Sequence, residues 1–453
     1  MKRKLRILYV GFNFPPNKIG GVSIYTNNLM NELVSRGHQV SYFYSEKQTL
    51  GIKPKLNKFT LESIEYYQLI NSPLMYPPVL NSIRDDYTNP ILKRIFKILL
   101  KNVRPDIVHF QDFFGNTTEM IHAAIADNAV VITTLHNYYP MCPTFNLFDR
   151  KANAICNRKD CNSGCLAKII PKNVIVQKIA QKYPLLILGI VEKLANQGFK
   201  TAFLFKSNMK NWKNLFYLRD FHYRKALNAV HINLAVSERV KQLYQNILKI
   251  DSNKIKMNHI GSRAAEFIHR EPATKSKSVI TFIFLGRLIA KKGFINLLEA
   301  FKSVDQNKAR LYVYAALDRD WRGLKAELEV NYNIKFKGSY QYEQLNEIFK
   351  DADVGVVTPI WEDNLPQILF EMQSAGLPII GARIGGVPDM IRDGHNGLLF
   401  RHDSVPDLKK CLQKIIDSPQ LIDKFRRNVK PVKTMKEHAR EIESLYYSYL
   451  KSA

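Results

Sequence analysis

The sequence contains no apolar run long enough to cross a membrane. Its most apolar segments, residues 7–12 and 183–191, are both shorter than the ~20 residues that a transmembrane helix requires. The first is also too short for the apolar core of a secretory signal, and Pro15 and Pro16 follow it without a small-residue cleavage site. We therefore expect residues 5–12 to form a buried strand in a cytoplasmic protein, either free or peripheral on the inner face of the cell membrane.

Cysteine is scarce as well, with five residues in 453, and this argues against a disulfide scaffold. Four of the five lie in one stretch, at Cys142, Cys156, Cys161 and Cys165. Four thiolates could hold Zn²⁺ in a closed tetrahedral site. Their spacing is not that of a standard zinc finger, however, and reduced or redox-paired thiols are the alternative. Cys411 is distant in the sequence and is expected in the core.

Acidic residues are too few to balance the basic ones. Asp and Glu number 40 against 67 Lys and Arg, which gives a net charge of +27. Such an excess predicts attraction to polyanions, namely nucleic acid, an anionic membrane surface or phosphate-bearing substrates. Because no recognised nucleic-acid-binding module occurs in the sequence, we expect no nucleic-acid partner.

The positive charge is concentrated in residues 166–230. Lys and Arg residues there, Arg219 among them, are opposed only by Glu192 and Asp220. The aromatic residues interleaved with them are Trp212, Phe216, Tyr217, Phe221 and Tyr223. A basic segment with aromatics can lie on an anionic bilayer, where each cation near the surface adds ~1 kcal/mol. We hypothesise that this segment docks the chain on such a membrane; a solvated basic face is the competing interpretation.

Short apolar runs rich in β-forming residues alternate with amphipathic helical patterns along the chain. This alternation predicts an α/β protein with parallel sheets that are covered by helices on both faces. The expected strands are residues 5–10, 39–44, 107–109, 129–134, 233–236, 280–285, 309–314, 334–336, 354–357 and 379–382. The expected helices include residues 25–36, 293–304 and 341–350.

A polar, weakly periodic stretch at residues 263–278 divides the chain. A chain of this length favours two domains over one core. We expect a Rossmann-like domain over residues 1–262 and another over 279–433, both doubly wound and facing each other across a cleft. Open α/β sheets bind ligands outside the carboxyl ends of their strands, so the cleft is the expected site. Residues 434–453 are expected to form a helix that packs back toward the first domain.

The densest group of candidate site residues follows the strand expected at 354–357. Pro366 suits the first turn of a helix, where its missing N–H has no cost, and Gly376 suits the end of that helix. Unpaired N–H groups and the positive end of the dipole make such an N-terminus an anion site. Asp363 before the helix and Glu371 within it could hold hydroxyl groups on two sides of a bound phosphate, or could merely support the helix.

Two more turns of the second half point to a phosphate ligand. Arg287 and Lys292 follow the strand at 280–285, and cations at the carboxyl end of a strand can neutralise a diphosphate without a metal. Gly385 and Gly386 follow a later strand and permit close approach of the backbone to a ligand. Taken alone, the first turn is equally consistent with a solvated basic loop and the second with a plain turn.

Together these turns resemble glycosyltransferase family 4, which has the GT-B fold of two facing Rossmann-like domains. Residues 286–293 match the family's G-R-L-x-x-x-K-G turn. Asp363 and Glu371 match its acid-x7-Glu motif, with Asp in place of the usual first Glu, and residues 385–389 match its G-G-x-P-E turn, with Asp for the final Glu. The sequence D-N-L-P at 363–366 is similar to that of relatives that build bacterial surface polysaccharides.

The resemblance extends to the first half. Gly20 and Gly21 stand where the family has a glycine pair whose N–H groups approach the donor phosphates. His136 stands where the family's histidine faces the reacting sugar, and Asn137 replaces the Asp that often follows it. For an isolated histidine at the end of a strand, a structural hydrogen bond is the alternative.

The resemblance implies a retaining, metal-independent glycosyltransferase that needs no cofactor. Its donor would be a nucleotide sugar, UDP- or GDP-linked, and its acceptor a glycan or lipid-linked molecule of bacterial lipopolysaccharide or capsule synthesis. The implied catalytic residues are His136 and Asp363, and Glu371 would contact the donor ribose. The implied donor-binding residues are Gly20, Gly21, Arg287, Lys292, Asn364, Leu365, Pro366 and Glu371.

Two other classes of function are open to this sequence. A nucleotide-sugar epimerase can use the same fold and needs no acceptor, so product analysis without an acceptor distinguishes it from a transferase. A basic nucleic-acid-binding protein would account for the net charge of +27, but it would leave the motifs of the second half unexplained.

Overall fold

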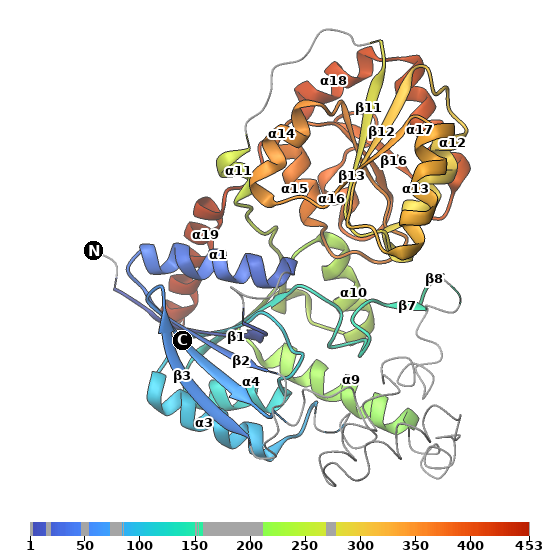
Figure 1. The fold of residues 1–453 in the computed structure, drawn as a ribbon. Coiled ribbons are helices and arrows are strands. Elements are labelled where there is room, and N and C mark those ends of the chain that lie inside the picture. The colour runs from blue at the N-terminus through green and yellow to red at the C-terminus, as the bar shows by residue number, and fades with distance from the viewer. Residues whose placement is uncertain are drawn as a thin grey trace, which may run out of the picture.

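The computed structural model describes residues 3–14, 20–46, 54–72, 84, 86–149, 152, 154–156, 212–268 and 278–452. These residues form two α/β halves, each built around a mostly parallel sheet (Figure 1). The α/β class with parallel sheets, predicted from the alternation of apolar runs and helical patterns, is therefore confirmed.

The sheet of the first half has eight strands in the order β10-β9-β6-β5-β1-β2-β4-β3. Its strands are β1 (Arg6–Phe12), β2 (Gln39–Ser45), β3 (Lys55–Leu61), β4 (Ile64–Ile70), β5 (Ile107–Phe110), β6 (Val130–Leu135), β9 (Ile232–Ala235) and β10 (Ile255–Met257). Every neighbouring pair is parallel except β3 and β4. The sequence analysis missed β3, β4 and β10. β3 is an exposed edge strand, so it lacks the continuous apolar run of the buried strands.

The sheet of the second half has six strands, all parallel, in the order β13-β12-β11-β14-β15-β16. Its strands are β11 (Ile280–Leu285), β12 (Ala309–Tyr314), β13 (Ile334–Gly338), β14 (Val354–Val357), β15 (Ile379–Ala382) and β16 (Gly397–Phe400). The order of the strands along the chain reverses between β11 and β14. The loops after these two strands therefore leave a topological switch point, where open α/β sheets bind ligands.

The helices flank the two sheets (Figure 1). In the first half they are α1 (Gly21–Ser35), α3 (Pro90–Val103), α4 (Thr118–Ala126), α9 (Trp212–Ala229) and α10 (Glu238–Leu248). The short α11 (Ala264–Phe267) lies on the connection between the halves and packs against α15 of the second half. In the second they are α12 (Phe294–Lys302), α13 (Arg319–Asn331), α14 (Leu345–Lys350), α15 (Gln367–Ser374), α16 (Val387–Met390), α17 (Val405–Asp417) and α18 (Gln420–Asn428). A short hairpin, β7 (Phe148–Asp149) and β8 (Ala154–Ile155), also belongs to the first half.

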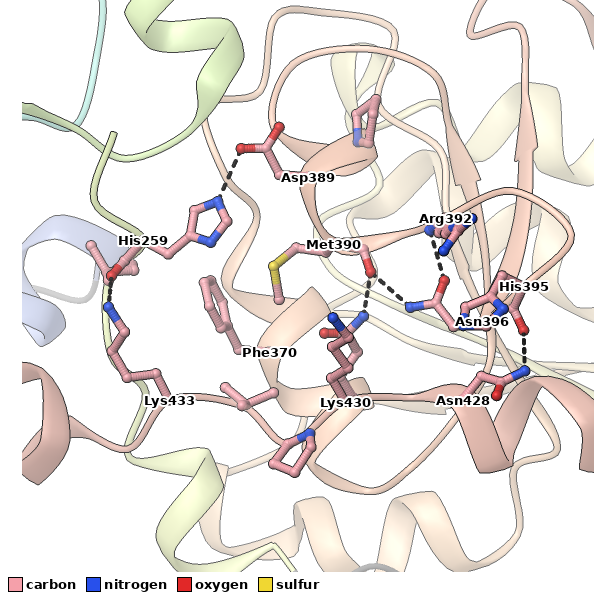
Figure 2. Close-up of a pocket in the computed structure, with 15 residues that line it drawn as sticks. His259, Phe370, Asp389, Met390, Arg392, His395, Asn396, Asn428, Lys430 and Lys433 are labelled. Carbon is pink, nitrogen blue, oxygen red and sulfur yellow. Dashed lines mark hydrogen bonds and ion pairs between the residues drawn. The ribbon is translucent and has the colours of Figure 1, made fainter. Parts of the chain in front are cut away.

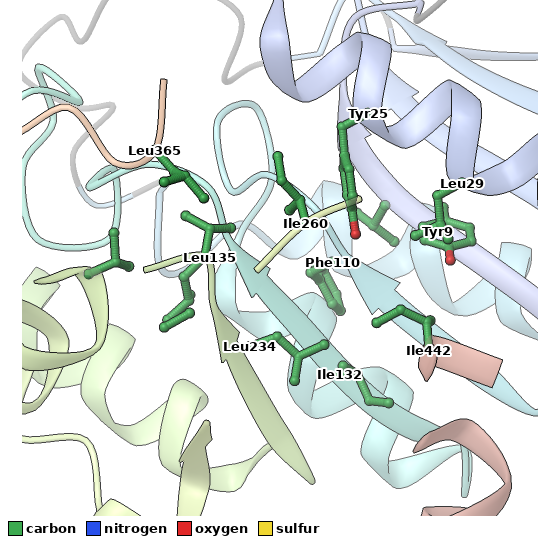
Figure 3. Packing of buried hydrophobic residues seen from close by; sticks show 14 of the residues in the cluster. Tyr9, Tyr25, Leu29, Phe110, Ile132, Leu135, Leu234, Ile260, Leu365 and Ile442 are labelled. Atoms are coloured by element: carbon green, nitrogen blue, oxygen red, sulfur yellow. The ribbon is translucent and has the colours of Figure 1, made fainter. Parts of the chain in front are cut away.

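The apolar core of the first half continues into the second. The inner strands carry uninterrupted buried residues, such as all six of β6, because parallel strands covered on both faces have no polar side. One large cluster covers the first sheet and includes Leu365 of the second half. Figure 3 shows Leu365 beside Leu135 at the end of β6. The loop after β14 is thus packed against the first sheet.

The last helix, α19 (Met435–Ser452), returns to the first half and lies beside α1 (Figure 1). The hydroxyl of Tyr446 lies 2.7 Å from both the Tyr9 hydroxyl and His109 Nδ1. The hydroxyl of Tyr25 on α1 lies 2.8 Å from His438 Nε2. Because buried polar groups need partners, these hydrogen bonds fix how α19 sits against the first sheet.

Candidate active site

The turn after β11 places two cations at the switch point of the second sheet. Gly286 has φ of +146° and Gly293 has φ of +69°, conformations that favour glycine. A Cβ on Gly293 would lie 1.8 Å from the carbonyl oxygen of Thr358. The Thr358 hydroxyl donates to the Lys292 carbonyl oxygen at 2.9 Å. These contacts join the turn after β11 to the loop after β14.

Lys292 and Asp363 form an ion pair across these two loops. Lys292 Nζ lies 2.7 Å from Asp363 Oδ2, and the two side chains are 34% and 10% exposed. Arg287, from the same turn as Lys292, is exposed to solvent. The structure therefore brings the predicted diphosphate-binding lysine and the predicted sugar-binding acid into direct contact.

The segment that carries Asp363 is held from both sides. Gly386 N–H donates to the Asp363 carbonyl oxygen at 2.8 Å. A Cβ on Gly385, whose φ is +57°, would lie 2.0 Å from that same oxygen. On the other side, Asn364 Nδ2 donates to the carbonyl oxygen of His136 in the first half. The glycine pair thus serves close packing of two backbones, and Asn364 connects the two halves at the site.

Glu362, the acidic residue directly before Asp363, is engaged elsewhere. Its carboxylate accepts from Arg239 Nε of α10 at 3.0 and 3.1 Å and is almost fully buried. Glu362 therefore forms a contact between the halves, while its neighbour Asp363 faces Lys292. This contact has no signal in the sequence, because Arg239 lies 123 positions away.

Glu371 lies on α15 in a strongly desolvated place. The helix begins at Gln367, and Pro366 is its N-cap rather than a residue of its first turn. Burial raises the pKa of the Glu371 carboxyl to about 7, because a low-dielectric environment disfavours the charged form. A carboxyl group with this pKa exists in both protonation states near neutral pH.

His136 follows β6 and is neutral at physiological pH. Burial, with a smaller contribution from His438, lowers the pKa of its imidazole to about 3. Its Nε2 lies 2.8 Å from Gln111 Oε1, so the neutral ring donates from Nε2. Asn137 instead donates to Asp112 Oδ2 at 3.0 Å. The residue that orients His136 is therefore Gln111.

Gln111 was missed by the sequence analysis, although it follows β5 directly and is buried. Its position, as a polar residue at the carboxyl end of a central strand, could have indicated a site residue, because ligands bind at that edge of an open α/β sheet. Its Nε2 and the Oδ1 of Asn364 are buried without a partner among the residues that the structure describes. Unpaired buried polar atoms are costly, and both atoms belong to residues that contact His136.

The glycine pair of the first half lies opposite α15. Gly20 is the N-cap of α1 and Gly21 is its first residue. Gln367 Nε2, at the start of α15, donates to the Gly21 carbonyl oxygen at 2.9 Å. The N-termini of α1 and α15, one from each half, are therefore adjacent, and each contributes the positive end of a helix dipole.

In the predicted membrane-docking segment, residues 166–211 and the side chain of Trp212 lie outside the described residues. On α9, Tyr217 and Phe221 are exposed, at 69% and 45%. Three of the proposed surface residues are buried instead: Phe216, Tyr223 and Arg219. Placing these three on a docking face was wrong. Arg219 Nε donates to buried Asp86 at 2.7 Å, and a buried charge requires such a partner.

The cysteine stretch is described only at Cys142 and Cys156; Cys161 and Cys165 lie outside the described residues. Cys142 Sγ lies 3.1 Å from the Thr144 hydroxyl. Within the ranges that the structure covers, no three His, Cys, Asp or Glu side chains gather as a metal-binding group. Within those ranges, too, no helix combines the length and the apolar character needed to cross a bilayer.

Two family models match this chain. One, described as Glycosyltransferase Family 4, covers residues 19–168, and the other, Glycosyl transferases group 1, covers residues 265–432. An uncharacterized glycosyltransferase of Methanocaldococcus jannaschii is 24% identical over 249 residues, which are 53% of this chain and 63% of the relative. The chain thus spans less than two thirds of the length of this relative.

Two solved structures share the fold over almost the whole chain. A glycosyltransferase from Rickettsia africae has a TM-score of 0.63 and 17% identity, with full coverage of both chains. Anabaena Alr3699/HepE, solved in complex with UDP, has a TM-score of 0.60 and 12% identity, covering 98% of this chain and all of the other. Glycosyltransferase family models thus match both halves of the chain and the architecture is shared, so the chain is a glycosyltransferase of the GT-B fold.

Proposed function

We propose that this chain is a retaining, metal-independent glycosyltransferase that transfers a sugar from a nucleotide-diphosphate sugar, UDP- or GDP-linked, to a glycan or lipid-linked acceptor. The observation that carries the proposal is the ion pair of Lys292 and Asp363 at the switch point, joined through Asn364 to the backbone of His136. Groups suited to a phosphate, a sugar hydroxyl and the reacting sugar come together there from both sheets.

The leaving diphosphate is the charge that such a site must stabilise. Lys292 and Arg287 would receive it, Arg287 with two parallel N–H donors, and the N-terminus of α15 adds backbone N–H groups and a positive dipole end. Preorganised donors of this kind stabilise a departing anion without a metal. A UDP complex of Anabaena Alr3699/HepE, which shares the fold, supports a nucleoside diphosphate as the ligand.

The sugar would lie between Asp363 and His136. When the diphosphate attracts Lys292, the carboxylate of Asp363 becomes free to accept from a sugar hydroxyl. The neutral His136 ring, with Gln111 holding Nε2, would hydrogen-bond the same sugar without adding positive charge beside the leaving group. In this arrangement Glu371 would bind the ribose hydroxyls, as the family resemblance implies.

The acceptor is proposed to be a precursor of bacterial lipopolysaccharide or capsule. If it is lipid-linked, the chain would act as a peripheral protein on the inner face of the cell membrane. Exposed Tyr217 and Phe221 on α9, near exposed Lys225, are the described part of the proposed docking segment. Flotation with vesicles that contain anionic lipid tests this: binding that disappears in Tyr217→Ser/Phe221→Ser supports it, and no binding at moderate salt refutes it.

The donor site is tested by thermal shift with UDP, GDP, ADP and CMP on the wild type, Arg287→Ala and Lys292→Ala. A ligand at 100 times its dissociation constant stabilises by ~2.7 kcal/mol. One nucleoside diphosphate should shift the wild type, and both variants should weaken that shift. No shift from any nucleotide at millimolar concentration would refute the donor-site assignment. Product analysis with and without an acceptor then separates transfer from epimerisation.

A further inference from the structure

A cavity of about 430 Å³ lies at the junction of the two halves, and none of the proposed donor-binding residues lines it. Its walls include His259 on the chain segment that leaves the first sheet and residues 430–433 on the segment that returns to it. The rest comes from Ile260, α15, α16, the turn that follows α16 and Asn428 at the end of α18 (Figure 2). A molecule bound there would touch both connections between the halves.

Hydrogen bonds within the wall hold the turn after α16 in shape. Gln373 Nε2 and Asn396 Nδ2 both donate to the Met390 carbonyl oxygen, at 2.7 and 3.0 Å. Asn396 Oδ1 accepts from the backbone N–H of Arg392 at 2.7 Å, and Asn428 Nδ2 donates to the His395 carbonyl oxygen at 3.0 Å. The turn is therefore built before any ligand arrives, and its own bonds do not use the Arg392 guanidinium.

The charges of the lining are unevenly compensated. Asp389, the acid of the lining, accepts from His259 Nε2 at 3.0 Å and from the Glu238 N–H at 2.7 Å. Lys433 donates to the His259 carbonyl oxygen at 3.0 Å and pairs with Glu441. For the side-chain nitrogens of Arg392 and Lys430, by contrast, no acceptor is found among the described residues. Two cations in the cavity wall, Arg392 and Lys430, therefore have no anionic partner among the described residues and are available to an anionic ligand.

The middle of the cavity is apolar. Phe370 and Met390 lie between His259 at one end and Arg392 at the other in Figure 2, and Val432 also contributes to the lining. A volume of about 430 Å³ falls within the range of small-molecule sites, roughly 300–1,000 Å³. The lining suits a small organic molecule whose carbon skeleton covers the apolar middle and whose anionic group meets the cations.

We propose that this cavity, named here the junction cavity, binds a small phosphomonoester. Arginine matches the oxygens of a phosphate with parallel N–H donors, and lysine adds a point charge. A phosphomonoester carries close to two negative charges at neutral pH, which matches Arg392 and Lys430 together. The site is separate from the proposed diphosphate site, whose cations are Arg287 and Lys292.

The test is calorimetric titration of the full chain with ribose 5-phosphate, inorganic phosphate and ribose, each in buffer of matched ionic strength. Ribose 5-phosphate should bind the wild type with at least tenfold higher affinity than ribose. It should also bind in the presence of saturating nucleoside diphosphate and to Arg287→Ala/Lys292→Ala. Arg392→Ala/Lys430→Ala should lose binding, whereas Arg401→Ala, an exposed arginine outside the cavity, should retain it.

Three results would overturn the proposal. One is the absence of binding by both phosphate probes at millimolar concentration. The second is binding that disappears in Arg287→Ala/Lys292→Ala and survives in Arg392→Ala/Lys430→Ala, which would assign the phosphate to the donor site. The third is equal binding of ribose and ribose 5-phosphate. Because Arg392 and Lys430 are exposed, their variants should fold, and Lys430→Glu provides a charge-reversed second variant.

Discussion

The two halves of the chain differ in the charge of the side chains that they contribute to the candidate active site: those of the first half are uncharged and those of the second half are charged. The first contributes His136, buried, uncharged at physiological pH and hydrogen-bonded to the neutral amide of Gln111. The second contributes Lys292 and Asp363 as an ion pair, with Arg287 exposed nearby. Under the proposed function, the second half would stabilise the charge of the leaving diphosphate, and the first half would position the sugar without altering that charge.

Among the predicted effects, the loss of activity on removal of Lys292 should be the largest. Lys292→Ala is expected to lower kcat by about 10²–10³, the loss typical when one preorganised donor to a developing anion is removed. The substitution also leaves the carboxylate of Asp363, 10% exposed, without its partner, so the melting temperature should fall. Steady-state kinetics with the purified chain and differential scanning calorimetry measure the two effects.

Two matched variants separate catalysis from stability in that experiment. Arg287→Ala removes an exposed cation of the same turn and should lower kcat without lowering the melting temperature. Lys308→Ala removes a lysine whose pair with Asp305 is on the surface, and it should change neither. If Lys292→Ala were as active as Lys308→Ala, the second half would not supply the charge stabilisation.

The raised pKa of Glu371 in the second half should be visible in the pH dependence of the free energy of unfolding. Its pKa is raised by burial from 4.5 to about 7, so the folded chain holds a proton that the unfolded chain has already released. The free energy of unfolding should therefore fall as the pH rises from about 4.5 to about 7, by about 3 kcal/mol in total. Glu371→Gln, which cannot ionise, should lack this loss.

Urea unfolding of the wild type and of Glu371→Gln at about pH 5 and about pH 8 measures the difference. The variant should gain stability relative to the wild type as the pH rises. Parallel pH dependence of the two chains would contradict a raised pKa at this position, and it would place Glu371 in contact with water.

Replacing Gly385 with alanine should reduce stability more than the same replacement at an unconstrained glycine. Gly385→Ala places a Cβ 2.0 Å from the Asp363 carbonyl oxygen at φ of +57°, so about 2 kcal/mol of stability should be lost together with donor affinity. Gly323→Ala on α13 meets no atom within 4 Å and should stabilise by about 0.5–1 kcal/mol. Denaturant unfolding of both variants checks the contrast, and a neutral Gly385→Ala would contradict the tight packing described here.

The sequence was sufficient for the parts of this site that depend on local pattern. Continuous apolar runs marked the inner strands, and the loops after β11 and β14 are short, so Lys292 and Asp363 could be expected at one edge of the sheet. The contacts made over long distances along the chain could not be predicted. Glu362 and Asp363 are adjacent acids, and only the folded chain shows that Arg239 binds one and Lys292 the other.

On α9, only some of the residues that were expected at the surface of the docking segment are exposed. Phe216, Arg219 and Tyr223 alternate along α9 with the exposed Tyr217 and Phe221, so composition alone could not distinguish its two faces. The helical period of 3.6 residues could have suggested that two faces exist. It could not have revealed Asp86, which lies 133 positions from Arg219 and compensates its charge.

The smallest predicted effect concerns the uncharged site residues of the first half, where we propose that Gln111 is a positioning residue for His136. Gln111→Leu removes the acceptor 2.8 Å from His136 Nε2 and is expected to lower kcat by about tenfold, since misplacement of a catalytic group costs rate rather than ground-state affinity. KM for the donor should change little. In a His136→Ala background the same substitution should have no further effect on kcat, because the residues then act as a unit.

Gln111→Glu tests the electrical side of the same contact. A carboxylate beside Nε2 favours the imidazolium and should raise the pKa of His136 from about 3 toward neutrality. Activity should then fall as the pH is lowered, whereas the wild type should show no such loss from His136 above about pH 4. The pH profiles of kcat for the wild type and Gln111→Glu show whether the variant alone loses activity at low pH. An unchanged profile would mean that the charge state of His136 does not matter to the reaction, and the contrast between the uncharged site residues of the first half and the charged ones of the second would lose its mechanistic meaning.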